Sequence, residues 1–259
     1  MAMIEIEGLA KSFGPVTAVR GVSLTVDKGE VLGFLGPNGA GKSTTMKMLT
    51  GFLTPSEGAA RICGRDVQSD PLPAQAMLGY LPEGAPAYGD MTPRGFLKFC
   101  AGVRGLKGAA AASAIDTAVR RTELARVLDQ PIETLSKGFK RRVGLAQSIL
   151  HDPPVLVMDE PTDGLDPNQK HVVRGLIREM SPEKAIIVST HILEEVAAIC
   201  TRAIIIDRGR IVADGPIADG RIAFRTTPET GEPGELNADA RDLDDVFRAL
   251  TQRPAPEAA

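Results

Sequence analysis

Several features that would place a chain in other classes are missing from this sequence of 259 residues. No stretch approaches the roughly 18–20 uninterrupted apolar residues that span a bilayer. Residues 1–7 show no basic segment followed by an apolar one. We therefore expect neither a membrane-spanning helix nor a secretion signal. The formal net charge of −3 argues weakly against a nucleic-acid partner, because polyanions are bound mainly through excess basic charge.

Cysteine and histidine are scarce, with three of each. Cys63, Cys100 and Cys200 are odd in number and far apart in the sequence. This pattern favours buried free thiols of a reduced cytosolic protein over a disulfide or a metal site. The histidines lack the close spacing of metal ligands.

A glycine-rich stretch, GPNGAGKST, lies between a predicted buried strand, Val31–Leu35, and a predicted helix over residues 44–49. Glycines permit backbone angles at which successive amides face one anion, and the helix N-terminus adds its positive dipole end. In the pattern G-x-x-x-x-G-K-[ST], the lysine supplies a charge for the β- and γ-phosphates and the hydroxyl can ligate Mg²⁺. The stretch predicts that a nucleoside triphosphate binds to Gly36, Pro37, Asn38, Gly39, Ala40, Gly41, Lys42, Ser43 and Thr44.

A pair of carboxylates, Asp159 and Glu160, follows a second apolar run in VLVMDEPTDGLDP. A parallel strand would deliver both to the sheet edge where ligands of open α/β sheets bind. Asp159 would hold Mg²⁺, commonly through water, and Glu160 would polarise the attacking water as a general base. The alternative, an acidic pair that caps a helix, is disfavoured by the phosphate-binding stretch upstream. His191 follows another predicted strand, where it could contact a γ-phosphate or hold the water, although a lone histidine there is more often structural.

Hydrophobic spacing predicts an α/β organisation. Alternation predicts edge strands at Ile4–Ile6 and Val22–Val26, and the alanine-rich residues 93–130 predict a helical subdomain. A further helix is expected over residues 135–150. Other strands are predicted at residues 77–81, Val155–Met158 and Ala185–Ser189, and a terminal hairpin at Ala203–Ile206 and Arg210–Ala213.

The composition becomes polar, acidic and turn-rich at about Thr226. We expect residues 226–259 to form an acidic linker and a C-terminal helix, Asp242–Thr251. One face of that helix would carry Leu243, Val246, Phe247 and Leu250.

A second turn that leads into a helix, LSKGFKRRVGLAQSIL, precedes the carboxylate strand, although one nucleotide needs only one such helix N-terminus. This order of motifs strongly resembles the ATP-binding subunits of ABC transporters over roughly residues 3–217. The resemblance implies the P-loop NTPase fold of the ABC ATPase type, an α/β fold with an antiparallel β subdomain and an α-helical subdomain at about residues 84–150. It places the ATP-binding domain at residues 3–225.

In that family two subunits dimerise head to tail, and the signature loop of each caps the ATP of the other. The resemblance therefore implies that Ser136 and Gly138, in the signature Leu135–Phe139, face the partner's γ-phosphate. It places Asp163–Asp166 in the D-loop, which couples the two sites. Lys42, Glu160 and His191 would be catalytic. ATP would also contact Phe13, whose ring stacks on adenine, and Asp166, and Mg²⁺ would be held by Ser43, Asp159 and Glu83, the last at the Q-loop position.

Three departures from the family pattern stand out. Glu83 replaces the usual glutamine, although a carboxylate could still approach Mg²⁺ and water. Lys137 and Phe139 replace a glycine and the glutamine of the usual Leu-Ser-Gly-Gly-Gln. The lysine could add a charge near the opposite phosphate or simply face solvent. Phe13 keeps the stacking ring of the usual tyrosine without its hydroxyl.

The combination of YLPE with LSKGFKRRVGLAQ resembles the branch that serves ABC-2 type exporters. The implied protein hydrolyses ATP with Mg²⁺, pairs with a second copy or a paralogous ATPase subunit, and drives a separately encoded integral membrane permease. It would act at the cytoplasmic face of the membrane, without nucleic acid. The alternative is a soluble non-transport ABC ATPase of translation or DNA repair. Those proteins usually carry two ATPase units or a long coiled coil, and extended heptads are missing here.

The helical subdomain and the Q-loop form, in the family, the groove for a coupling helix of the permease. Pro86, Tyr88 and Met91 lie where such a groove would be lined. For Tyr88 and Met91, groove lining and ordinary packing stay equally open. For Phe96 and Phe99, packing inside the subdomain is the favoured interpretation.

Overall fold

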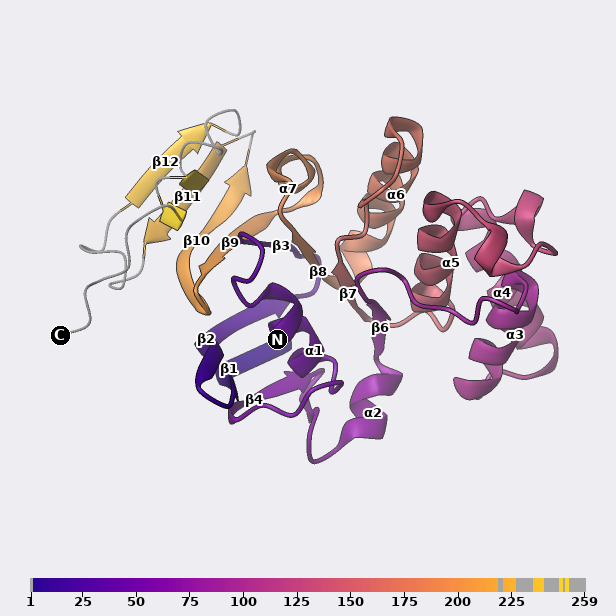
Figure 1. The fold of residues 1–259 in the computed structure, drawn as a ribbon, viewed down its shortest axis with the longest axis horizontal. Coiled ribbons are helices and arrows are strands. Elements are labelled where there is room, and N and C mark those ends of the chain that lie inside the picture. Colours follow the sequence, from indigo (N-terminus) through magenta and orange to yellow (C-terminus); the bar gives the residue numbers. More distant parts are fainter. Residues whose placement is uncertain (1, 219–220, 227–234, 240–246, 249, 252–259) are drawn as a thin grey trace.

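The computed structural model describes residues 2–218, 221–226, 235–239, 247–248 and 250–251 (Figure 1). The strands are β1 Ala2–Phe13, β2 Val16–Asp27, β3 Val31–Leu35, β4 Glu57–Ile62, β5 Arg65–Asp66, β6 Leu78–Leu81, β7 Val155–Asp159, β8 Ala185–Thr190, β9 Arg202–Asp207, β10 Arg210–Ala218, β11 Arg221–Thr226 and β12 Glu235–Asp239. The α-helices are α1 Lys42–Leu49, α2 Pro71–Ala76, α3 Pro93–Val103, α4 Gly108–Arg121, α5 Lys137–Ile149, α6 Pro167–Met180 and α7 Leu193–Ile199. Short 3-10 turns lie at Ala125–Val127, Ile132–Thr134 and Ser181–Glu183.

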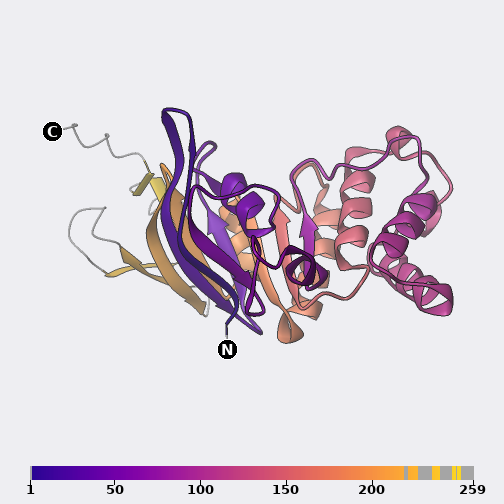
Figure 2. The same cartoon turned by 90° about the horizontal axis from the view of Figure 1, so that it is seen from below.

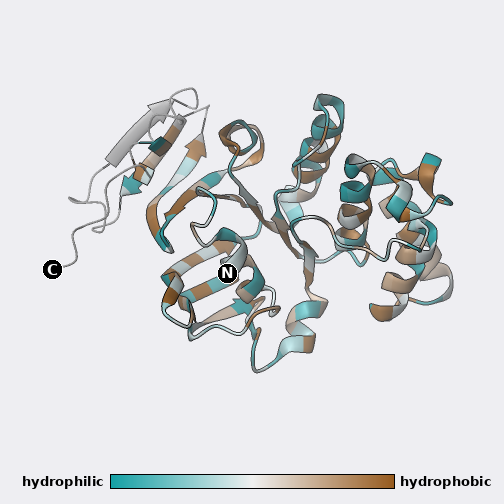
Figure 3. Cartoon of the chain, in the orientation of Figure 1, coloured by the Kyte–Doolittle hydropathy of each residue, from teal (hydrophilic) through white to brown (hydrophobic). Residues whose placement is uncertain are grey.

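The larger sheet has the order β12-β11-β10-β9-β3-β8-β7-β6. Its strands from β9 to β6 are parallel, whereas β10, β11 and β12 add on antiparallel. The central strands are continuous apolar runs because both of their faces are covered (Figure 3). Val155 and Val157 of β7 face one core, while Leu156 and Met158 face the other. The parallel strands therefore all present their carboxyl ends at one sheet edge.

The smaller sheet, β2-β1-β4-β5, is antiparallel and packs with α1 against one face of the larger sheet. The prediction of an edge strand at Ile4–Ile6 is wrong, because β1 lies between β2 and β4. The sequence EGAARI of β4 gave no strand signal because it is rich in small residues with low β-propensity.

Helices α3, α4 and α5 form an arm at one end of the molecule, opposite β11 and β12 (Figure 2). The arm confirms the predicted helical subdomain as part of the P-loop ABC ATPase fold. Helix α5 begins at Lys137, two residues later than predicted, because Leu135 is extended and Ser136 is the N-cap. Among the described residues, no helix combines the length and the apolarity needed to cross a membrane.

The C-terminal part differs from the linker expected over residues 226–259. Strand β12 lies within that range and pairs with β11. The described residues of the predicted final helix are helical, and Leu250 is buried in the core. Residues 242–246 and 249 of that helix lie outside the described residues. The cysteines are free thiols, of which Cys200 is buried and Cys63 and Cys100 are partly buried.

Candidate active site

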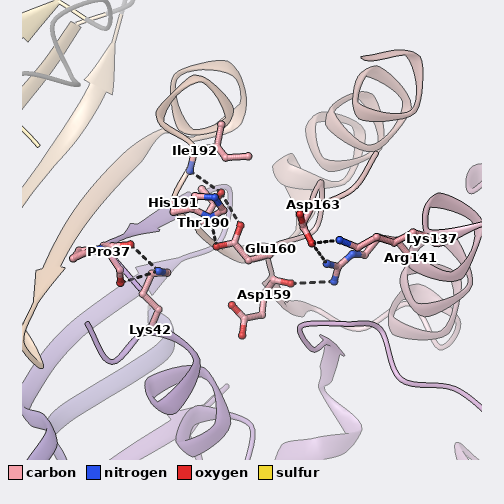
Figure 4. A network of polar contacts seen from close by, with 11 residues as sticks. Pro37, Lys42, Lys137, Arg141, Asp159, Glu160, Asp163, Thr190, His191 and Ile192 are labelled. Carbon is pink, nitrogen blue, oxygen red and sulfur yellow. Dashed lines mark hydrogen bonds and ion pairs between the residues drawn. The ribbon is translucent and has the colours of Figure 1, made fainter. Parts of the chain in front are cut away.

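The phosphate-binding stretch joins β3 to α1 at the carboxyl edge of the larger sheet. Gly41, the N-cap of α1, has φ 106°, and a Cβ there would lie 2.6 Å from the carbonyl oxygen of Ala18. Only glycine suits this position. The Lys42 ammonium donates to the carbonyls of Gly36 at 2.6 Å and Pro37 at 3.2 Å (Figure 4). The Lys42 ammonium thus lies across the mouth of the loop, where a bound anion would replace the two carbonyls as its partner.

Strand β7 ends at Asp159, which is 1% exposed. Neither of its carboxylate oxygens has a hydrogen-bond partner within the described residues. A buried carboxylate without partners is costly unless a cation accompanies it. Asp159 therefore presents two free oxygen ligands of the kind that hard divalent cations prefer.

Glu160 follows in the left-handed backbone region, at φ 51°. Such a conformation costs a non-glycine residue about 1–3 kcal/mol and is common at functional sites. Its amide donates to the Ser189 carbonyl at 2.8 Å. The carboxylate accepts a hydrogen bond from the Thr190 hydroxyl at 3.1 Å and lies 2.8 Å from Nδ1 of His191. Contacts from β8 and the turn after it thus fix the direction of the Glu160 carboxylate.

Lys42 and Glu160 line one cavity of about 320 Å³ together with Ser43 and Glu83, whereas Asp159 is outside that lining. Burial lowers the pKa of Lys42, and the negative charges of Glu160, Asp159 and Glu83 oppose that shift. The same three carboxylates also act on the buried Arg141 guanidinium. Three negative groups thus face two positive ones, which leaves room for a cation beside the phosphates of a nucleotide.

The protein-family model described as ABC transporter matches residues 19–163 of this chain. The chain belongs to the ABC transporter ATP-binding family. It is 36% identical over 214 residues to Nod factor export ATP-binding protein I of Ralstonia nicotianae, covering 82% of this chain and 67% of that protein. It is also 37% identical over 214 residues to the probable multidrug ABC transporter ATP-binding protein YbhF of Escherichia coli, covering 82% of this chain but 37% of YbhF.

Solved ABC cassettes share the fold. A structure described as the ATP binding subunit of an ABC transporter superposes with a TM-score of 0.78 at 31% identity, covering 84% of this chain and 91% of that one. The dimeric structure of MJ0796, a bacterial ABC transporter cassette, has a TM-score of 0.78 at 21% identity, which shows the fold alone; it covers 83% of this chain and 99% of that one. The family and the fold establish the chain as an ABC ATPase.

Not every residue that the ABC motifs predicted lies at this cavity. Phe13 is 51% exposed at the end of β1, with the Lys11 ammonium 5.4 Å from its ring centroid. Ser136 caps α5 by accepting from the Phe139 amide at 3.4 Å, and Asp166 caps α6. These residues are outside the cavity lining, which is composed of Ala18, Asn38, Gly39, Gly41, Lys42, Ser43, Thr44, Glu83 and Glu160. The other predicted site residues outside this lining are Gly36, Pro37, Ala40, Gly138, Asp159 and His191.

Sequence reasoning missed two contributors to this ABC site. Ala18, from the hairpin of β1 and β2, forms part of the wall, and nothing in its local sequence marks it. The Thr190 hydroxyl donates to the Glu160 carboxylate and itself accepts a hydrogen bond of 3.1 Å from the backbone amide of Ile192. A hydroxyl residue directly before His191 at a strand end was the one available signal.

Proposed function

We propose that this ABC ATPase powers a separately encoded membrane permease of an ABC-2 type export system. The observation that carries the proposal is that Lys42 and Glu160 line one cavity, with the charge of Asp159 acting on Lys42, while no signature residue belongs to the cavity lining. The relatives named for Nod factor export and multidrug transport support export. The cavity carries groups suited to nucleotide binding, but the signature turn at the start of α5 is not part of its lining.

The loop amides and Lys42 would hold the β- and γ-phosphates of ATP, replacing the carbonyls that Lys42 now contacts. Ser43 and the unpartnered oxygens of Asp159 would hold Mg²⁺, and the exposed Glu83 can approach the same ion. When bound, Mg²⁺ neutralises charge on the phosphate oxygens. The surplus of carboxylates around Lys42 fits this cation.

Glu160 would direct water at the γ-phosphorus as general base. A carboxylate has about four lone-pair sites, so Glu160 can accept a proton from water while Thr190 and His191 hold its orientation. His191, half exposed beside Glu160, would stabilise charge that develops on the γ-phosphate.

A second copy of the chain would complete each site. Ser136 and Lys137 are exposed at the N-terminus of α5, where backbone amides and the helix dipole favour an anion. In the close-up, Lys42 and Lys137 lie on opposite sides, with Glu160 and Asp163 between them (Figure 4). Head-to-tail association of two copies would bring the turn of one onto the γ-phosphate in the other.

The permease would dock on a groove of about 720 Å³ between α2, β6, α3 and α5. Three apolar side chains on its rim are largely exposed, Phe52 at 79%, Leu72 at 78% and Val103 at 70%. Exposed apolar groups gathered around one groove mark an interaction site. Phe99, predicted to be packed inside the subdomain, is 46% exposed and lines this groove, whereas Phe96 is buried as predicted.

For Tyr88 and Met91, the sequence is compatible with either groove lining or packing. Tyr88 packs edge-to-face on Phe96 and Phe99, with ring centroids 6.1 Å and 5.7 Å apart, and Met91 packs on the core. Neither lines the groove, and neither does Pro86. An apolar docking surface favours the transporter over a soluble non-transport ABC ATPase.

The test combines an ATPase assay with light scattering on purified Glu160→Gln protein, with and without Mg-ATP. In the ATPase assay we expect turnover to fall by about 10²- to 10⁴-fold, the usual contribution of a general base. In light scattering we expect the mass to double only with ATP. Adding Lys42→Ala should remove the mass change, and Ser136→Arg should block it while leaving nucleotide binding intact. Turnover near the wild-type rate would reject Glu160 as the base, and a mass that stays monomeric would reject ATP-driven pairing of the isolated chain.

A further inference from the structure

The signature lysine has an unexpected partner within its own subunit. Lys137, the first residue of α5, donates to the Asp163 carboxylate at 2.8 Å (Figure 4). Asp163 opens the D-loop, and its amide donates to the Glu160 carbonyl at 3.1 Å. The lysine remains largely exposed to solvent, as one of the two sequence-based alternatives held, but it also reaches a turn that begins at the proposed general base.

Packing reinforces this contact. A Cβ at Gly164, which has φ +70°, would lie 2.5 Å from Cδ and 2.8 Å from Cε of Lys137. The aliphatic part of the lysine thus lies directly on the D-loop backbone. The hydrogen bond from Lys137 is also the largest of the effects that lower the pKa of Asp163.

A second cation of α5 converges on the same loop. Arg141, one helical turn after Lys137 and 2% exposed, lies 3.6 Å from the Asp163 carboxylate. Its guanidinium also donates to the carbonyls of Asp159 at 3.4 Å and Pro82 at 3.3 Å. One buried side chain thereby joins the signature helix to the end of β7, to the residue before Glu83, and to the D-loop.

We propose that Lys137 is a positioning residue: with Arg141 as a buried anchor, it holds the D-loop, and through it Glu160, against the signature helix of the same subunit. The proposal rests on the catalytic role proposed above for Glu160. Thr190 and His191 hold the Glu160 carboxylate, whereas its strained backbone is held by the turn that follows, through the hydrogen bond from the Asp163 amide. Movement of the signature helix on pairing of two copies would then reach the base through this clamp.

The size of the effect follows from exposure. Lys137 and Asp163 are 67% and 42% exposed, so solvent weakens their ion pair. Loss of an exposed pair changes an equilibrium by about twofold to fivefold. We therefore expect Lys137→Met to lower kcat by about twofold to fivefold and to leave KM for ATP unchanged, since Lys42 and its loop are untouched.

A double-mutant cycle tests the pairing. Lys137→Met, Asp163→Asn and the double variant are compared for kcat, with Lys137→Arg as the conservative rescue. A charge swap is unsuitable, because a lysine at position 163 would face Arg141. Lys140→Met is the matched control, because Lys140 lies on the same helix as Lys137 but donates to the Glu133 carbonyl, at 2.7 Å, and not to the D-loop. If the pair is real, the double variant is no slower than Asp163→Asn, and Lys137→Arg is close to wild type.

Hydrogen exchange of the Asp163 and Leu165 amides, measured on the monomer without nucleotide, separates this proposal from the proposed function. Both amides donate within the turn, to Glu160 and Thr162. Lys137→Met should speed their exchange by about twofold to fivefold even if ATP-driven pairing fails. Unchanged exchange, or effects of the two single variants on kcat that multiply in the double variant, would overturn the clamp; the multiplied effects would assign Lys137 to the partner's phosphate.

Discussion

At the scale of single residues, two adjacent carboxylates at the end of β7 have opposite surroundings. Asp159 is buried with both oxygens unpartnered among the described residues, whereas Glu160 has one partner for each oxygen. An unpartnered buried carboxylate suits a cation, and a carboxylate held in direction suits proton transfer. The sequence DE after an apolar run predicted both residues, but the difference between them depends on Thr190 and His191, which arrive from a different strand.

His151, at the groove, makes a residue-scale prediction about stability. Its Nε2 lies 3.1 Å from the Leu78 carbonyl, while Nδ1 is buried without a partner among the described residues. The pKa of His151 is lowered to about 4, mainly by burial and then by the positive charges of Arg104 and Lys184. The hydrogen bond to the Leu78 carbonyl and the charge of Asp152 oppose this shift. The folded state therefore favours the neutral ring.

The sign of the pH dependence follows from that preference. The contribution of a neutral His151 to stability is fully present above the unfolded pKa of about 6.5 and is lost as the pH falls towards 4. Allowing for solvent screening, we expect the wild type to lose about 1–2 kcal/mol more unfolding free energy over this range than His151→Gln. Urea unfolding at several pH values measures it, with the exposed His171→Gln as control. Parallel curves for wild type and His151→Gln would contradict the assignment.

At the scale of elements, predictability followed the strength of the local pattern. Strands β3, β7 and β8 are apolar runs, of which the last two end in polar residues, and they were predicted within a residue or two. Strand β4 and strand β12 were not, because alanine, glycine and acidic residues carry little strand signal and become strands only through their neighbours. The contact of Lys137 with Asp163 joins residues 26 positions apart, and only the packing of α5 against β7 and the D-loop brings them together.

The packing of α5 on β6 makes an element-scale prediction. A Cβ at Gly79 would lie 2.1 Å from the Ser148 carbonyl oxygen of α5 and 2.6 Å from Leu156. Gly79→Ala must push the helix away from the sheet, and we expect a loss of about 1–3 kcal/mol of unfolding free energy, as for other overpacked cores. Gly102→Ala is the control, because nothing lies within 4 Å of a Cβ there and helix propensity favours alanine by up to about 1 kcal/mol. Thermal unfolding of the wild type and both variants measures this. A Gly79→Ala variant as stable as the wild type would show that α5 shifts without cost.

At the scale of the whole molecule, helix α5 connects the groove of the helical arm to the D-loop beside Glu160. The N-terminus of α5 carries the signature turn, and Gln147 near its other end lines the groove. Arg141, between them, contacts the end of β7 and the D-loop. A rigid helix of this kind can transmit displacement of the arm to the site, because packed interfaces move as units instead of deforming. Docking at the groove and closure over ATP are therefore expected to be linked.

Val103 offers a test of that link. It is 70% exposed at the groove, so Val103→Asp should leave folding intact, but a permease docked there would bury an unpaired carboxylate. The cost of burying such a group, about 1–3 kcal/mol, corresponds to a loss of permease affinity of about tenfold to a hundredfold. Lys98→Asp on the same helix is the control, because Lys98 is exposed but lines no part of the groove. Binding is measured in detergent with the proposed permease, which would be sought among membrane proteins encoded near this chain's gene. Loss of binding in the Val103 variant alone, with equal ATP turnover of the isolated chain in both variants, would place the permease on the arm. Equal binding by both variants would place the docking surface elsewhere and contradict the proposed link through α5.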